Sequence, residues 1–109
     1  MKKSLLLLGF VSLSSLAFAG AKSYEIILNS PSQAGALHLP AGDYKIKLDG
    51  AKAVFTDTRT NKSVTTDIKV KTTDRKFSHT AVDSSKQPDG DRIDAIELGG
   101  SNTEIEFAY

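Results

Sequence analysis

A run of alternating side chains sets the strongest limit on what this chain can fold into. After the corner Pro40-Ala41-Gly42, apolar residues and lysines alternate: Tyr44, Ile46 and Leu48 against Lys45 and Lys47. A period of two is that of a β-strand with one buried and one exposed face. Asp49-Gly50 follows, and glycine accepts the positive φ angle of a tight turn. The pattern therefore predicts a β-hairpin with a two-residue loop.

The register of this hairpin follows from that loop. It pairs Leu48 with Ala51, Ile46 with Ala53 and Tyr44 with Phe55. A second hairpin is expected around the polar loop 59–62, because Asn61 tolerates a left-handed backbone. Beyond it, residues 64–70 show the cleanest alternation in the chain, with Thr66 expected opposite Phe55. Three consecutive strands would then share one buried face.

The rest of the chain also favours short strands. Further strands are expected at 24–28, 36–39, 77–82, 93–98 and 105–109. Ser84 to Asp91, which contains Pro88, Asp89 and Gly90, is predicted to be the longest loop. Between residues 93 and 98 the apolar positions shift from odd to even, which indicates a bulge or a strand covered on both sides. We predict an all-β domain, either a small antiparallel β-sandwich or a closed barrel of seven to eight short strands.

The first nineteen residues have the features of a secretory signal peptide. A basic head, an apolar run from Leu5 to Val11 and the small residues of Ala17-Phe18-Ala19 follow one another. The apolar run is interrupted well short of the roughly twenty residues that a membrane-spanning helix needs. We therefore expect cleavage after Ala19, a single β-domain over residues 20–109, and export to the periplasm or the extracellular space without membrane insertion of the mature chain.

Charge and cysteine content exclude several kinds of function. Cleavage removes Lys2 and Lys3 from the 14 basic side chains and leaves 12 against 13 acidic ones. A nearly neutral chain with scattered lysines is not expected to bind nucleic acid. The sequence has no cysteine, so the exported domain must be stable without disulfides and has no thiol for catalysis or metal binding.

Four groups of polar residues are candidates for a functional site. His38 and His79 lack neighbours at metal-ligand spacing, and Asp83, Asp89, Asp91 and Asp94 lack the spacing of a calcium-binding loop. Glu97 and Glu104 are expected to face one another across the Gly99-Gly100 turn, with Ile96 opposite Ile105, as solvated carboxylates. Asn61-Lys62-Ser63 fits a glycosylation sequon, a spacing that arises often by chance. We assign no catalytic, cofactor-binding or metal-binding residue, and the acidic segment from Asp83 to Asp94 stays open as an ion site.

Two segments carry a resemblance to known proteins. Leu39-Pro40-Ala41-Gly42-Asp43-Tyr44-Lys45-Ile46, together with residues 93–103, resembles small exported bacterial all-β proteins of acidobacterial type, which have no assigned activity. The corner Pro40-Ala41-Gly42-Asp43-Tyr44 is also similar to that of transthyretin-like and carboxypeptidase-regulatory-like sandwich domains. Both resemblances imply an exported β-domain, and neither supplies a functional residue.

The expected function is a non-catalytic binding or structural module of the cell envelope, with a protein or a glycan as partner. The loop from Ser84 to Asp91 is the first surface to consider, since rigid β-scaffolds place function in loops. Two alternatives stay open. A carrier of small molecules needs a cavity inside a barrel, and a hydrolytic enzyme needs His38 or His79 to meet an acidic residue in a pocket.

Overall fold

The computed structural model describes residues 22–109 and shows an all-β chain over that range. The expected signal peptide, residues 1–19, lies outside the described residues. Ten strands are present, which is more than the seven or eight predicted. They are β1 (Tyr24–Leu28), β2 (Ser32–Ala34), β3 (Leu37–Leu39), β4 (Gly42–Asp49), β5 (Lys52–Asp57), β6 (Ser63–Asp67), β7 (Lys69–Thr72), β8 (Ala81–Gln87), β9 (Gly90–Glu97) and β10 (Thr103–Glu106).

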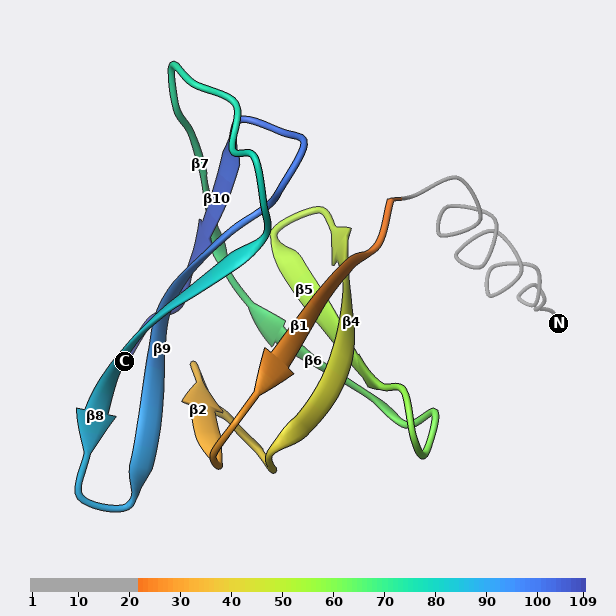
Figure 1. Cartoon of the computed structure of the whole chain (residues 1–109), viewed down its shortest axis with the longest axis vertical. Coiled ribbons are helices and arrows are strands. Elements are labelled where there is room, and N and C mark those ends of the chain that lie inside the picture. The colour runs from red at the N-terminus through yellow and green to blue at the C-terminus, as the bar shows by residue number, and fades with distance from the viewer. Residues whose placement is uncertain (1–21) are drawn as a thin grey trace, which may run out of the picture.

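The strands form two sheets that do not close into a barrel (Figure 1). The first sheet has the order β1-β4-β5-β6, and all its neighbours are antiparallel. The second has the order β3-β2-β9-β10-β7, with β8 on the other side of β9. Within it β2 runs parallel to β9, so the sheet is mixed rather than purely antiparallel. The barrel alternative is therefore wrong, and the carrier that required a barrel cavity loses its premise.

One hydrophobic core joins the two sheets. The first sheet contributes the side chains that alternation predicted, including Tyr44 and Ile46, which are almost fully buried. Phe55 lies at the centre, with its ring 6.5 Å from that of Tyr44 and 6.0 Å from that of Phe107. The second sheet adds Ala34, Leu39, Ile93, Ile96, Leu98 and Ile105. Burial of these apolar surfaces is the main term that stabilises the fold, since the chain has no disulfide.

The first hairpin has the predicted faces but not the predicted register. Leu48 pairs with Ala53 and Ile46 with Phe55, because the loop consists of Gly50-Ala51 rather than Asp49-Gly50. Gly50 has φ of +62° as the first loop residue, which suits a type II′ turn. The partner of each residue is therefore shifted by two positions. A shift of two keeps every side chain on its original face, so the buried face was predicted correctly although the register was not.

The strand expected over residues 64–70 is two strands in two sheets. β6 pairs with β5, and its register is again shifted by two, with Val64 rather than Thr66 opposite Phe55. Asn61 has the expected positive φ, at +66°. The chain leaves the first sheet at the half-buried Ile68 and continues as β7 beside β10. Val64 and Val70 are 41% and 46% exposed, so the third strand of the predicted buried face is only partly covered.

The segment from Ser84 to Asp91 is not a long loop. It forms the end of β8, a short turn at Pro88-Asp89 and the start of β9, as the long hairpin of Figure 1 shows. Phe77, expected in a strand, lies in the connection before β8. Backbone pairing with β9 accounts for this strand, because its own side chains are polar and mostly exposed.

The expected irregularity of β9 is a β-bulge. The partner of β9 changes register between Asp83 and Ser84, which leaves Asp94 as the extra residue of β9. Ile93 and Ile96 therefore both belong to the core although three positions separate them. Across β10, Glu97 lies opposite Glu104 and Ile96 opposite Ile105, as predicted. β10 itself ends at Glu106, so Tyr109 does not belong to the last strand.

Candidate functional site

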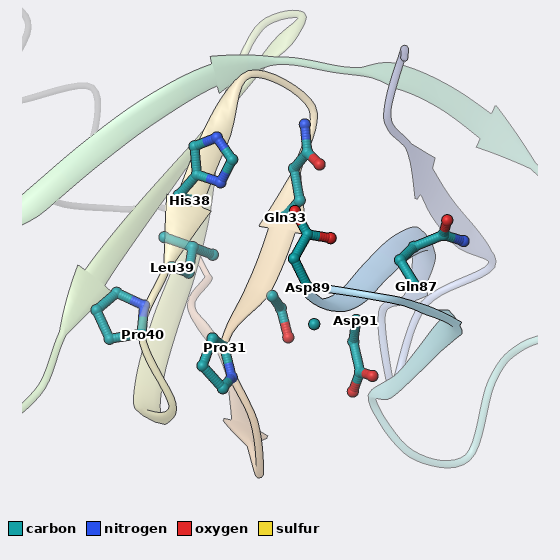
Figure 2. Close-up of a pocket in the computed structure, with 10 residues that line it drawn as sticks. Pro31, Gln33, His38, Leu39, Pro40, Gln87, Asp89 and Asp91 are labelled. Carbon is teal, nitrogen blue, oxygen red and sulfur yellow. The ribbon is translucent and has the colours of Figure 1, made fainter.

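A cleft of about 340 Å³ lies between the β2–β3 hairpin and the turn that joins β8 to β9 (Figure 2). His38, Leu39 and Pro40 form one wall, and Gln87, Asp89 and Asp91 come from the other (Figure 2). Pro31, Ser32, Gln33 and Gly90 complete the lining. The two prolines thus provide apolar contact area, and carboxylates, amides and an imidazole provide polar groups, a combination typical of ligand sites.

The two walls meet where β2 runs beside β9. Ser32 pairs with Asp91 and Gln33 with Arg92, and the Asp91 amide donates to the Pro31 carbonyl at 3.0 Å. The Ser30 hydroxyl also donates to the Asp91 carboxylate at 2.8 Å. Gly90 lies against this junction with φ of +137°, and a Cβ there would lie 2.7 Å from the Pro31 oxygen. The base of the cleft is therefore fixed by backbone contacts.

The polar groups of the cleft mainly accept hydrogen bonds. Asp89 is exposed at the tip of the hairpin, and Asp91 has the Lys86 ammonium 3.8 Å from its carboxylate, a distance at which the ion pair is weak. The Gln33 amide group donates to the Gly35 carbonyl at 3.1 Å, which fixes its orientation. Carboxylates are acceptors only, so the cleft suits a ligand that presents several hydroxyl or amine donors.

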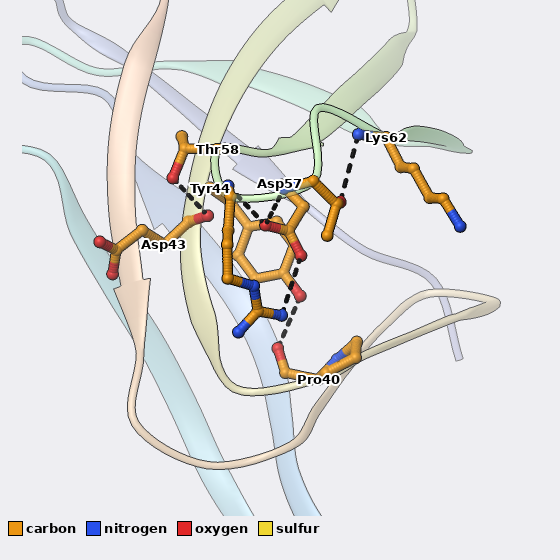
Figure 3. Close-up of polar contacts among 8 residues, drawn as sticks. Pro40, Asp43, Tyr44, Asp57, Thr58 and Lys62 are labelled. Carbon is orange, nitrogen blue, oxygen red and sulfur yellow. Dashed lines mark hydrogen bonds and ion pairs between the residues drawn. The ribbon is translucent and has the colours of Figure 1, made fainter.

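A second groove, of about 260 Å³, lies on the other side of β3. Its floor is mostly apolar and includes Leu37, Tyr44, Phe55 and Val64. At one end the Tyr44 hydroxyl donates to the Pro40 carbonyl at 2.6 Å, which attaches the end of β3 to the first sheet (Figure 3). β3 is thus a narrow ridge between two concave surfaces, and His38 borders both.

At the edge of this groove the loop between β5 and β6 is held by the Asp57 carboxylate. Its oxygen accepts from the amides of Arg59 and Thr60, at 2.9 and 3.3 Å. The Asp57 amide donates to the Lys62 carbonyl at 2.8 Å, and the Arg59 guanidinium lies 3.8 Å from the carboxylate. These contacts explain Asp57 as a loop-fixing residue.

The structure brings together only some of the residues that the sequence singled out. His38 faces Asp89 and Asp91 across the cleft, whereas His79 lies exposed in the connection before β8. Asp94 lies outside the cleft lining and accepts hydrogen bonds from Ser85 and Arg92, at 2.8 and 3.2 Å. Within residues 22–109 no group of three histidine, aspartate or glutamate side chains is placed to hold a metal ion.

Sequence reasoning missed the β2 side of the cleft. No strand was expected between residues 28 and 36, but β2 begins at Ser32 and carries Gln33 into the lining. A parallel pair of two residues leaves no period in a sequence. Pro31 and Pro40, which flank β2 and β3, were the available signal of this short hairpin, because proline favours the ends of edge strands.

Tyr44 and Tyr109 donate hydrogen bonds to the β2–β3 segment, to the carbonyls of Pro40 and Gln33. The raised pKa values of these two hydroxyls predict a loss of stability at high pH. Burial raises the pKa of Tyr44 above its usual 10.0, with a further rise from Asp57 that Arg59 opposes. Burial also raises the pKa of Tyr109, against opposing effects of the Gly35 backbone and Arg92. A raised folded-state pKa gives stability that is complete below pH 10 and is lost as pH rises through the folded-state values.

We therefore expect the urea midpoint to be constant from pH 8 to pH 9.5 and to fall above pH 10. The double variant Tyr44→Phe/Tyr109→Phe has a lower midpoint at pH 8 and a smaller fall above pH 10. An equally steep fall in this variant would contradict the assignment.

Comparison with known proteins adds no relative. No family model, curated protein or solved structure matches this chain. The resemblances noted from the sequence therefore stay predictions. Over residues 22–109 the structure contains no helix long and apolar enough to cross a membrane.

Proposed function

We propose that this chain is an exported β-sandwich domain that acts as a non-catalytic binding module of the cell envelope. The observation that supports this most is the cleft, where polar side chains from two hairpins converge beside an apolar wall. Both walls are built on paired strands and fixed at their junction by backbone hydrogen bonds. Such a site loses little conformational entropy on binding.

A glycan of the envelope is the ligand that this chemistry favours. Sugar hydroxyls donate to carboxylates and amide oxygens, and the carbon face of a sugar ring can lie against the exposed Pro31 and Pro40. A cleft of about 340 Å³ is at the lower end of the usual range for ligand sites, so it fits one or two sugar units. The hydrolytic alternative requires His38 to act with an aspartate, and His38 is exposed on β3.

The decisive experiment measures binding of soluble oligosaccharides from bacterial envelopes to the purified protein by calorimetry. We expect Asp89→Asn to weaken binding about tenfold, because hydrogen bonds to charged groups are worth about 1.5–3 kcal/mol. Asp49→Asn, at the exposed end of β4 away from the cleft, is the matched control and should bind normally.

Three results would contradict the proposal. One is an absence of binding to every oligosaccharide, and another is equal binding by Asp89→Asn and the parent. The third is binding only to basic peptides with a steep salt dependence, which would identify a cationic protein as partner. Release of a cleaved sugar product would show an enzyme instead.

A further inference from the structure

The β2–β3 hairpin, one wall of the cleft, has few backbone pairs with the rest of its sheet. β2 contacts β9 through two residue pairs, Ser32 with Asp91 and Gln33 with Arg92. β3 pairs only with β2, so the hairpin lies at the end of its sheet. This junction is short, so the burial of Ala34 and Leu39 in the core and side-chain contacts from other segments add to it in holding the hairpin.

Tyr109 provides one of these contacts at the point where β2 meets β9. Its hydroxyl lies within hydrogen-bonding distance of two backbone carbonyls, that of Gln33 on β2 at 2.7 Å and that of Ile93 on β9. The hydroxyl has one proton, which these two acceptors share. One side chain therefore links the two strands directly.

The ring of Tyr109 is held as well. The Arg92 guanidinium lies 4.9 Å from the ring centroid, a cation–π distance, and Arg92 also bonds to Asp94 at 3.2 Å through its Nε. The side chain is nevertheless 54% exposed as a whole. Tyr109 therefore lies on the surface of the β2–β9 junction and bridges its two strands, and it is not part of the core.

The consequence for the cleft follows from Gln33. Its backbone carbonyl accepts from Tyr109, and its side chain lines the cleft. Its partner on β3 is His38, the residue that faces the β8–β9 turn. A shift of β2 away from β9 would therefore move His38 and Gln33 away from Asp89.

We propose that Tyr109 is a positioning residue that sets the width of the cleft by holding β2 against β9. Pro40, which follows β3, is attached to the first sheet through the Tyr44 hydroxyl, so release of Tyr109 lets β2 and the Gln33 side chain move relative to that attachment. The effect on ligand affinity rests on the proposed function, but the change in cleft width does not.

The test measures this width without a ligand. Because the sequence has no cysteine, a His38→Cys/Asp89→Cys protein carries two unique spin labels, one on each wall. Pulsed electron resonance gives the distribution of distances between them. In the Tyr109→Phe background we expect a broader distribution with a longer mean, and about tenfold faster amide exchange in β2, the effect of one lost hydrogen bond.

Tyr24→Phe is the matched control, because Tyr24 on β1 makes no hydrogen bond to residues 30–40 and does not line the cleft. It should leave the distance distribution and the exchange of β2 unchanged. If Tyr109→Phe yields too little folded protein, Arg92→Gln removes the cation over the ring and must broaden the distribution as well. Identical distributions in Tyr109→Phe and its parent, both folded by circular dichroism, would overturn the proposal. Such a result would leave oligosaccharide binding at the cleft unaffected.

Discussion

Phe55→Ala should remove a large part of the stability of this protein at 25 °C. Phe55 is fully buried on β5 and contacts the rings of Tyr44 and Phe107 from two directions. Truncation of a buried phenylalanine costs about 3–5 kcal/mol, because it removes apolar contacts and leaves a cavity that the neighbours fill only partly. Small domains have about 5–15 kcal/mol of stability in total. Without a disulfide, nothing covalent limits the unfolded chain.

Urea unfolding followed by far-ultraviolet circular dichroism measures this loss. Phe55→Leu keeps most of the volume and should cost less than half as much. Val64→Ala, opposite Phe55 on β6 but 41% exposed, is the control and should change the unfolding free energy by less than about 1 kcal/mol. A loss below about 1 kcal/mol for Phe55→Ala would mean that the two sheets do not share the core described.

The sequence predicted which face of a strand is buried better than it predicted which residues pair across two strands. Alternation from Tyr44 to Leu48 identified the buried side correctly, since the direction of a side chain depends only on its position along the strand. The turn decided the register, and Asp49-Gly50 and Gly50-Ala51 both place a glycine in a two-residue loop. Because the two registers differ by two residues, the apolar pattern cannot distinguish between them.

Polar strands were the least predictable part of the fold. β8 has few apolar residues, and it is a strand because its backbone pairs with β9. The same limitation applied to the break at Ile68, where alternation continues across a change of sheet. Periodicity reports which residues share a face, whereas membership of a sheet depends on partners that are distant in the sequence.

The candidate site could be predicted only in fragments. His38 and the turn at Asp89 were each singled out, but they are half the chain apart and meet only because β2 runs parallel to β9. The sequence predicted Tyr109 at the end of a strand, and its contacts with Gln33 and Ile93 depend on the same junction. The pairing of Glu97 with Glu104 was predicted correctly, because a short turn fixes the register of adjacent strands.

Gly90→Ala should damage both stability and the cleft, and it is the second large effect that we expect. Gly90 has φ of +137°, a region that is essentially restricted to glycine, and an added Cβ would lie 2.7 Å from the Pro31 oxygen. Backbone strain and overpacking each cost about 1–3 kcal/mol. The clash also pushes Pro31 away from the Asp91 amide, whose hydrogen bond of 3.0 Å joins the two walls.

Substitutions at Gly50 and Gly99 distinguish the effect of backbone strain from that of the steric clash. Gly50 has φ of +62° with nothing within 4 Å of an added Cβ, so Gly50→Ala carries strain alone, about 1–2 kcal/mol. At Gly99 an added Cβ would lie 2.5 Å from the Thr80 nitrogen, and φ is outside the left-handed region, so Gly99→Ala carries the clash alone. Only Gly90→Ala should also weaken the oligosaccharide binding that we propose, among variants that stay folded at 10 °C, because only its clash involves the lining of the cleft. Equal binding by all three variants would show that the Pro31–Asp91 junction does not control the ligand site.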